Sequence, residues 1–315
     1  MMSKKLTICI PTYNRLRFLK KQITFLKSEI NQNKSLLDDI DFIVCDNASE
    51  DETDVFLKKL ESKNDFFKCY VNSENLGLIG NVTKLLSLST TDFVWFLSDD
   101  DELEKGVLNN VIDVISSNNN LNFIFLNFFV NNKKAFIPYS GLISNSKEVA
   151  VEIFKQSYGS LVLISSCIYK RENLNNIKKH KFFNNLHSPL LYSFYCCSIG
   201  DIYIFETPLV NFKTGNSSYS GIRKNIKFKF EGYIPIVESL VDFGFSERDM
   251  YNMINKFIKN QSPFHLLYLF INLSNSLFLF KKYYSLKEKL SFPIIFFQFF
   301  LKSTNLKLKQ KSIKI

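Results

Sequence analysis

The first 130 residues alternate short apolar runs with longer amphipathic segments, and this alternation limits the fold more than any other feature. The apolar runs predict strands, and the segments between them predict helices. Repeated units of this length indicate an α/β fold, with a mostly parallel sheet flanked by helices. The expected strands are Leu6–Ile10, Asp41–Cys45, Phe67–Asn72, Phe93–Leu97 and Asn122–Val130, and the expected helices are Leu16–Ile30, Thr53–Lys63, Gly80–Leu88 and Lys105–Ser116.

The alternation loosens after residue 131. We expect a helix at Lys147–Gln156 and strands at Leu161–Tyr169 and Asp201–Phe212. The polar stretch Lys213–Lys224 contains Gly and Ser, and its ordinary interpretation is a surface connection. From Phe228 onward the pattern is helical again.

The stretch FVWFLSDDDE, which begins at Phe93, runs from a predicted buried strand directly into acidic residues. Ligands of open α/β sheets bind at the carboxyl ends of the strands, and Asp99, Asp100 and Asp101 lie there. Two unit charges about 5 Å apart repel by roughly 3 kcal/mol at an effective dielectric near 20. Mg²⁺ or Mn²⁺ would relieve this repulsion, because both prefer oxygen ligands. The alternative is that these residues only cap the following helix.

Three other polar segments follow predicted strands, namely Pro11–Arg15, Asp46–Asp51 and Asn75–Asn81. One edge of the sheet would then carry a tyrosine that can stack on a base, carboxylates for a ribose, and a metal for a diphosphate. Each feature also has an ordinary interpretation. Tyr13 could be a turn residue, and Asp46 could cap a turn, although Ser49 and Asp51 lie closer to the next helix.

The glycines of the third segment do not form a dinucleotide-binding fingerprint, because such glycines directly follow the first strand. PTYNR occupies that place in this chain. We therefore interpret Gly77 and Gly80 as structural residues that shape the entry into a helix.

Together, the segments IPTYNR, CDNASED, NLGLIGN and FLSDDDEL resemble the family 2 glycosyltransferases of the GT-A fold, including the abequosyltransferase-like branch of bacterial surface-polysaccharide enzymes. The resemblance covers about residues 5–130 well and extends more loosely to about 220. Ser98 stands where the longer acidic motif of the family has its first acid. The site residues that follow are Pro11, Thr12, Tyr13, Arg15, Asp46, Asn75 and Asp99 for the nucleotide, and Asp99, Asp100 and Asp101 for Mg²⁺ or Mn²⁺.

The resemblance implies transfer of a sugar from a nucleotide-activated donor to a glycan hydroxyl, with inversion, in the synthesis of lipopolysaccharide O-antigen, capsule or lipooligosaccharide. It also implies a GT-A domain over residues 1–225, with a nucleotide-binding half to about 130 and an acceptor half from about 131. A helical, basic and apolar extension would occupy 226–315. The two alternatives are a receiver-like phosphoacceptor domain and an inactive GT-A-like scaffold that binds a glycan or a partner.

The catalytic base is the residue for which the chain departs from its relatives. Many members of the family have an aspartate about 90 residues after the metal motif. This chain has no acidic residue from Phe182 until Asp201. His187 can accept a proton near neutral pH, because an unperturbed imidazole titrates near pH 6.5. We therefore expect His187 to be the base, with Asp201 in reserve. The alternative is that His187 is a buried core residue.

The net charge of +10 is concentrated in the C-terminal part, where nine lysines from Lys281 onward accompany one acid, Glu288. This part is rich in Phe and Leu and poor in Arg, which favours anionic lipid over nucleic acid as its partner. Its apolar stretches, Phe264–Phe280 and Leu290–Leu301, are short and interrupted. We expect interfacial attachment and a lipid-linked acceptor; a buried helical subdomain is the alternative.

The cellular location is predicted from the cysteines and from the amino terminus. The six cysteines show no C-x-x-C spacing, which favours reduced core residues of a cytosolic protein. Residues 1–5 lead into a short strand and show no pattern of a signal peptide. We expect a cytoplasmic protein at the cytoplasmic face of the inner membrane.

Overall fold

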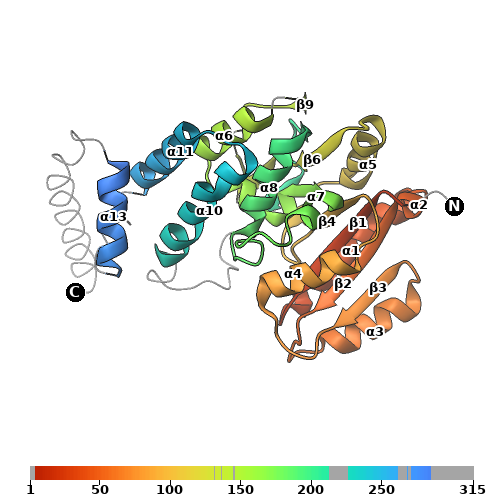
Figure 1. The fold of residues 1–315 in the computed structure, drawn as a ribbon. Coiled ribbons are helices and arrows are strands. Elements are labelled where there is room, and N and C mark those ends of the chain that lie inside the picture. The colour runs from red at the N-terminus through yellow and green to blue at the C-terminus, as the bar shows by residue number, and fades with distance from the viewer. Residues whose placement is uncertain are drawn as a thin grey trace, which may run out of the picture. The chain divides into compact units, whose positions relative to one another are not determined.

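A computed structural model describes residues 4–130, 132–135, 137–144, 146–212, 226–261, 268 and 271–284. Figure 1 shows the ribbon. The chain divides into two compact units. The first contains Met1–Ser217 and Asp242–Phe245, and the second contains Ser218–Val241 and Ser246–Ile315. The division of the first part into a nucleotide half and an acceptor half stays a prediction.

An eight-stranded sheet forms the centre of the first unit, in the order β3-β2-β1-β4-β10-β6-β11-β9. All of its strands run in one direction except β10 and β9. The predicted α/β fold with a mostly parallel sheet is therefore confirmed. The strands are β1 (Leu6–Thr12), β2 (Ile40–Asp46), β3 (Phe67–Val71), β4 (Phe93–Phe96), β6 (Leu121–Phe125), β9 (Gly141–Ile143), β10 (Cys167–Lys170) and β11 (Asp201–Ile204).

Helices flank this sheet. α3 packs on β2 and β3, α4 packs on β1 and β2, and α8 packs on β6, β10 and β11. Their apolar residues recur at helical spacing, so each helix buries one face. The helices of the first unit are α1 (Leu16–Gln32), α2 (Leu36–Asp39), α3 (Thr53–Lys63), α4 (Gly77–Leu88), α5 (Val107–Ser117), α6 (Ser146–Gln156), α7 (Arg171–Asn176) and α8 (Ser188–Ile199).

The start of α4 requires glycine at two positions, which confirms the structural interpretation of both. Gly77 has a φ of +71°, a left-handed value that other residues rarely adopt. A Cβ atom at Gly80 would lie 2.8 Å from the Cβ of Leu76. The helix begins at Gly77, three residues before the predicted start at Gly80.

Two predicted strands are each two strands in the structure. The stretch Asn122–Val130 forms β6 and then β7 (Phe128–Val130), and Asp201–Phe212 forms β11 and then β12 (Val210–Phe212). The second strand of each pair joins a four-stranded sheet, in the order β5-β12-β7-β8, with β5 at Glu102–Leu103 and β8 at Lys133–Lys134. The side chain of Asn127 donates to the carbonyls of Phe205 (2.9 Å) and Glu206 (3.4 Å), which holds both turns together.

The predicted strand Leu161–Tyr169 is also partly wrong. Two 3₁₀ turns, η1 (Ser160–Val162) and η2 (Ile164–Ser166), precede β10. The indole Nε1 of Trp95 donates to the carbonyl oxygen of Ser165 at 2.9 Å, so the buried end of β4 fixes the second turn.

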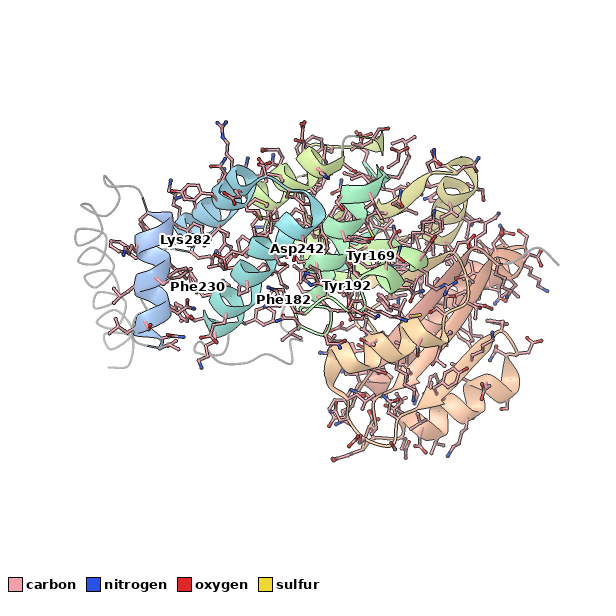
Figure 2. The ribbon with its side chains drawn as sticks, viewed as in Figure 1. Tyr169, Phe182, Tyr192, Phe230, Asp242 and Lys282 are labelled. Carbon is pink, nitrogen blue, oxygen red and sulfur yellow. The ribbon has the colours of Figure 1, made fainter. Side chains whose placement is uncertain are left out.

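The core of the first unit is aromatic. Tyr169 and Tyr192 are buried, and their rings meet edge to face with centroids 5.9 Å apart (Figure 2). All six cysteines are free, and five of them are buried, the exception being the half-buried Cys69. Burial raises the pKa of the Cys9 thiol to about 12. The prediction of free core cysteines therefore holds for five of the six, and Cys69 is not a core residue.

The described part of the second unit is helical, as predicted from Phe228 onward. Its elements are η3 (Phe228–Tyr233), α10 (Ile234–Glu238), η4 (Ser239–Phe243, which ends in the first unit), α11 (Glu247–Asn260) and α13 (Leu273–Tyr283). The rings of Phe230 and Tyr268 stack with centroids 5.0 Å apart, and the Tyr268 hydroxyl donates to Glu231 at 3.0 Å. In the part of the chain that the structure describes, no helix combines the length and apolar character needed to cross a membrane. The stretches Lys213–Lys224 and Leu290–Leu301, and part of Phe264–Phe280, lie outside the described residues.

Candidate active site

Four neighbouring parallel strands, β3, β2, β1 and β4, end at one edge of the large sheet. In the strand register, Thr12 at the end of β1 pairs with Asp46 at the end of β2, and Asp46 pairs with Val71 at the end of β3. Phe96 ends β4 beside Cys9 of β1, and the aspartates follow it. The loops that carry PTYNR, CDNASED and DDD therefore meet at this edge, as the sequence predicts.

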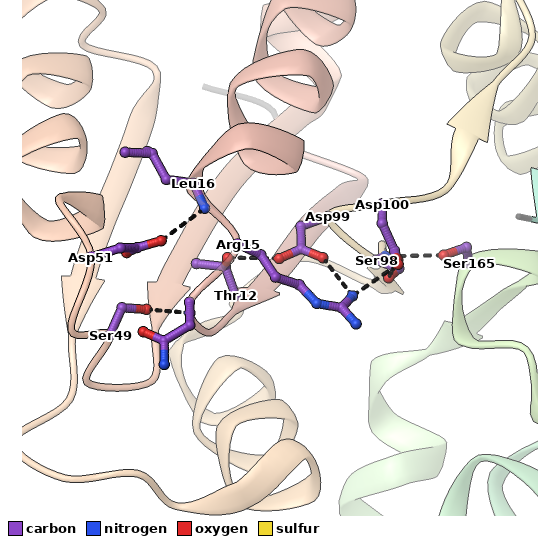
Figure 3. Close-up of polar contacts among 10 residues, drawn as sticks. Thr12, Arg15, Leu16, Ser49, Asp51, Ser98, Asp99, Asp100 and Ser165 are labelled. Atoms are coloured by element: carbon purple, nitrogen blue, oxygen red, sulfur yellow. Dashed lines mark hydrogen bonds and ion pairs between the residues drawn. The ribbon is translucent and has the colours of Figure 1, made fainter. Parts of the chain in front are cut away.

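Thr12, Arg15, Asp99 and Asp100 form one cluster (Figure 3). The Thr12 hydroxyl donates to Asp99 Oδ2 at 2.7 Å. Arg15 Nη1 lies 3.3 Å from Asp99 Oδ1 and 2.9 Å from Asp100 Oδ2. A single guanidinium thus bridges two neighbouring carboxylates.

Two serines hold the acidic loop in place. The Ser98 hydroxyl donates to Asp100 Oδ1 at 2.6 Å, and its backbone N–H donates to Ser165 Oγ at 2.9 Å. Ser98 stands where the longer family motif has an acid, and here it positions the second aspartate. Ser165 lies 67 residues later in the chain, at the turn before β10.

The cluster has more negative than positive charge. Asp99 and Asp101 are 4% and 7% exposed. The pKa of each is raised to about 6: burial is the largest cause and the nearby aspartate charges add to it, whereas Arg15 and hydroxyl hydrogen bonds lower it. Buried carboxylates with raised pKa values have too little positive charge around them. An additional cation would stabilise their ionised form.

The donor set fits a hard divalent cation, because it consists of carboxylate oxygens. Among the described residues, however, no group of three or more Asp, Glu, His or Cys side chains is placed to hold a metal ion. Arg15 engages Asp99 and Asp100 in this arrangement. Binding of a cation by all three aspartates would therefore require Arg15 to give up these contacts. The metal set Asp99, Asp100 and Asp101 stays a prediction.

Hydrogen bonds link the loops after β1 and β2 to each other. The backbone N–H of Asn14 donates to Ser49 Oγ at 2.8 Å, and the Ser49 hydroxyl donates in turn to Asp46. Asp51 accepts from the backbone N–H groups of Leu16 (3.1 Å) and Thr53 (3.2 Å), so it lies at the starts of both α1 and α3. Burial alone would raise the pKa of Asp51, but hydrogen bonds from the Thr53 hydroxyl and from these backbone N–H groups lower it overall.

The predicted nucleotide residues differ in their exposure. Tyr13 is 40% exposed, so its ring is available to a ligand. Thr12 is buried, and its hydroxyl donates to Asp99. Asp46 is fully buried, and its carboxylate accepts from the Ser49 hydroxyl. Pro11 lies inside β1 and is buried, so its predicted place in the loop is wrong.

Asn75 belongs to a network of amides between the ends of β2 and β3 and the start of α4. Asn47 Nδ2 donates to Asn75 Oδ1 at 2.8 Å, and Asn72 Nδ2 donates to Asn47 Oδ1 at 2.9 Å and to Asn81 Oδ1 at 3.2 Å. Lys84 Nζ donates to Asn72 Oδ1 at 2.6 Å. Asn75 itself is exposed. Its oxygen therefore shapes the loop, and a nucleotide contact of this residue stays a prediction.

The two candidate bases lie at different ends of the sheet. Asp201 opens β11 and lies level with Leu121, which opens β6, so it is at the edge opposite to the aspartates. This position argues against Asp201 as the base. His187 precedes α8. Late in α8, the Cys196 thiol accepts from Asn173, and Asn173 also donates to Asn122 near the amino end of β6. The start of α8 therefore points toward the edge with the aspartates. His187 is 2% exposed, which favours the alternative of a core histidine in the state described here.

Sequence reasoning missed several residues of this site. Ser165 is far from the acidic motif in sequence, and no local pattern marks it. Asn47 could have been found, since it directly follows Asp46 in the CDNASED segment. Gln22 of α1 was treated as an ordinary helix residue, although it is 4% exposed and its amide nitrogen has no hydrogen-bond partner among the described residues.

Comparison with known proteins gives a family model and curated relatives. The model described as "Glycosyl transferase family 2" matches residues 7–188, which is more than half of the chain. The GalNAc(5)-diNAcBac-PP-undecaprenol beta-1,3-glucosyltransferase of Campylobacter jejuni is 36% identical over 109 residues, which are 34% of this chain and 33% of that protein. Abequosyltransferase RfbV of Salmonella typhimurium is 38% identical over 104 residues, 33% of this chain and 30% of that protein. The matches thus span about a third of these relatives.

Solved structures share the fold. The S. aureus TarS 1–349 structure in complex with UDP-GlcNAc matches with a TM-score of 0.61 and 13% identity, over 84% of this chain and 79% of that chain. The mannosyltransferase PcManGT from Pyrobaculum calidifontis, in complex with GDP-Man and Mn²⁺, matches with a TM-score of 0.57 and 12% identity, over 98% of this chain and 81% of that chain. At these identities the likeness shows the GT-A fold alone.

Proposed function

We propose a reaction for this chain from one premise: the chain belongs to glycosyl transferase family 2. It transfers a sugar from a nucleotide-activated donor to a hydroxyl of a glycan acceptor during synthesis of a bacterial surface polysaccharide. The names of two partial relatives, a glucosyltransferase that acts on an undecaprenol-linked glycan and an abequosyltransferase, support this class of reaction. The donor sugar and the linkage are left open.

The observation that carries the proposal is the bridge from Arg15 to Asp99 and Asp100, two residues after the exposed Tyr13. Tyr13 would stack on the base of the donor, and a carboxylate would accept from a ribose hydroxyl. Arg15 would then be close enough to exchange its aspartate contacts for the diphosphate oxygens, since a guanidinium binds both groups well. The buried hydroxyl of Thr12 would hold Asp99 in position throughout.

A divalent cation fits the same cluster, and Asp99, Asp100 and Asp101 would hold it. Mg²⁺ or Mn²⁺ would stabilise the negative charge on the leaving diphosphate. Asp99 and Asp101 suit this role, because both carboxylates are buried with too little positive charge around them. Arg15 would be the residue that moves.

His187 is our proposed base, and the proposed outcome is inversion at the anomeric carbon by direct displacement. Its place before α8, at the end directed toward the aspartates, supports the role. Its burial means that the imidazole must become accessible when the acceptor binds. The acceptor hydroxyl would give its proton to the imidazole as it attacks.

The acceptor is proposed to be lipid-linked, and the protein to attach to the cytoplasmic face of the inner membrane. In the described part of the C-terminal region, α13 exposes Leu273 (59%), Leu277 (51%) and Phe278 (51%). Lys281 follows them at the end of the helix. Apolar side chains beside lysines are the composition of an interfacial helix, in which each lysine contributes about 1 kcal/mol near anionic lipid.

A donor screen tests the proposed function. A panel of UDP-, GDP-, CDP- and TDP-sugars is added with Mn²⁺, and the thermal unfolding midpoint and the release of nucleotide are measured. A bound donor at 100 times its dissociation constant adds about 2.7 kcal/mol of stability. Protection without turnover in the presence of acceptor lipids would favour the inactive scaffold. No protection by any sugar nucleotide would contradict the proposal.

A further inference from the structure

A cavity lies beside the aspartates, between α1 and the chain that leads from β4 to α5. Its volume is about 600 Å³, enough for a sugar residue. The wall from α1 consists of Phe18, Lys21, Gln22 and Phe25. The opposite wall is the run from Asp99 to Lys105. The aspartates therefore border both this cavity and the cluster around Arg15.

The wall of this cavity contains a buried polar group without a hydrogen-bond partner in the described part of the chain, the amide nitrogen of Gln22. Its side chain lines the cavity and is 4% exposed, yet its Nε2 has no hydrogen-bond partner among the described residues. A buried amide without a partner costs about 1 to 3 kcal/mol, so such groups are rare unless a ligand or water satisfies them. The other buried polar residue of α1, Glu29, accepts from the backbone N–H of Gly106 at 2.9 Å, whereas Leu19, Ile23 and Leu26 are apolar.

The remaining lining defines the class of ligand. Phe18 and Phe25 are half-buried and offer apolar ring surface. The lining includes five acidic residues, Asp99, Asp100, Asp101, Glu102 and Glu104, and two lysines, Lys21 and Lys105, and Arg15 pairs with two of the acids from outside it. Away from a bound cation, a ligand with phosphate groups would be repelled by this excess of negative charge. A ligand with hydroxyl groups and one apolar face matches the rings, the amide and the carboxylates together.

We propose that the cavity between α1 and the Asp99–Lys105 segment binds a neutral or amino-bearing sugar residue of the acceptor. The inference rests on the proposed function, because it gives this sugar the role of acceptor. The Gln22 amide donates to an oxygen of the sugar, carboxylates accept from its hydroxyls, and a phenylalanine ring covers its C–H face. The acceptor is thereby held next to the aspartates, and the first half of the chain contributes to its recognition.

Saturation-transfer NMR on the full chain tests the site directly. The probes are the methyl glycosides of glucose, galactose, N-acetylglucosamine and glucosamine. They are added at millimolar concentration to the wild type, to Gln22→Leu and to Phe25→Ala. Gln32→Leu is the matched control, because it makes the same chemical change on an exposed position of the same helix. Unfolding curves verify that each variant is folded.

At least one glycoside should bind the wild type and Gln32→Leu equally, and its dissociation constant should rise about 3- to 10-fold in Gln22→Leu. Phe25→Ala should also weaken binding. The signal should persist when a protecting sugar nucleotide is present. Equal binding by Gln22→Leu, no binding of any glycoside to the wild type, or loss of the signal on addition of a sugar nucleotide would each overturn the acceptor assignment.

Failure of this inference can be separated from failure of the proposed function. If sugar nucleotides protect the protein from unfolding and no glycoside binds, the donor site stands and the acceptor site is wrong. If glycosides bind in the Gln22-dependent way and no sugar nucleotide protects, the cavity is a sugar site of a protein without donor chemistry. In that case the acceptor role is overturned together with the proposed function.

Discussion

The hydroxyl of Thr12 donates a 2.7 Å hydrogen bond to the carboxylate of Asp99, and both side chains are at most 4% exposed. The two residues are 87 positions apart in the chain. They meet because β1 and β4 are neighbouring parallel strands that end at the same edge. The bond makes the position of the acidic loop depend on the end of the first strand.

Replacement of Thr12 by valine tests this dependence. Valine keeps the shape and removes the donor, which leaves a buried carboxylate with one fewer hydrogen bond. A hydrogen bond to a charged group contributes about 1.5 to 3 kcal/mol, and we expect the free energy of unfolding at pH 7.5 to fall by about that amount. Urea unfolding measures it. Thr24→Val, at an exposed position of α1, is the control, and a Thr12→Val protein as stable as this control would contradict the prediction.

Asp101 should make stability depend on pH. Burial raises its pKa to about 6 in the folded protein, whereas an aspartate in an unfolded chain titrates near pH 3.9. The folded state therefore binds the proton more tightly, so this residue destabilises the fold above pH 6, and that effect is lost as the pH falls toward 4. At 1.36 kcal/mol per pKa unit, we expect Asp101→Asn to be more stable than the wild type by about 1 to 3 kcal/mol at pH 7.5.

Most of this gain should be lost by pH 4, because the folded carboxyl is then protonated and the unfolded one about half protonated. Denaturant unfolding of the two proteins at several pH values gives the comparison. Asp113→Asn changes an exposed carboxylate of α5 and should show no such pH-dependent gain. A gain for Asp101→Asn that is the same at pH 4 and pH 7.5 would show that the burial argument is wrong.

The same aspartates give a prediction for the metal. Asp100→Asn or Asp101→Asn should lose divalent-dependent turnover and remain folded, because each change relieves repulsion between neighbouring carboxylates. A chelator should abolish turnover in the wild type. Added Mn²⁺ should restore turnover in the wild type and not in the aspartate variants. Asp113→Asn is again the control. Full activity in excess chelator, with both aspartates replaced, would exclude them as metal ligands.

Tyr13 is expected to stack on the base of the donor. Because the ring is 40% exposed, Tyr13→Ala should leave the stability nearly unchanged. It should weaken binding of the free nucleotide by roughly 1 to 3 kcal/mol, by analogy with stacking of bases on aromatic side chains. Tyr13→Phe keeps the ring and is the matched control. Calorimetry that finds one affinity for all three proteins would remove Tyr13 from the site.

The sequence predicts best those elements whose bounds depend on residues close together in the chain. Helix α3 has the predicted bounds, Thr53–Lys63, because its apolar spacing and its start near Asp51 are read from adjacent residues. The edge with the aspartates was predictable for a similar reason, since strand ends and polar loops follow each other along the chain. The family resemblance added the roles of these residues.

Other features depend on contacts between distant segments. The division of Asn122–Val130 into two strands follows from hydrogen bonds of Asn127 to the chain near 205, and a pattern of apolar residues does not contain that information. Ser165 reaches the acidic loop only because β10 is inserted between β4 and β6. Burial of Gln22 depends on the segment that leads from β4 to α5.

His187 gives the sharpest test of the mechanism, because its burial and its proposed chemistry favour different outcomes. If it is the base, His187→Ala should lose about 100-fold or more in turnover and retain the affinity for the donor. The acid limb of the pH–rate profile should disappear with it. If it is only a core residue, the same variant should lose stability instead, and its remaining turnover should keep the wild-type pH profile. Turnover, donor affinity and unfolding are therefore measured on one preparation. A near-normal turnover with an unchanged acid limb would exclude His187, and since Asp201 lies at the opposite edge of the sheet, the acceptor itself would then have to supply the base.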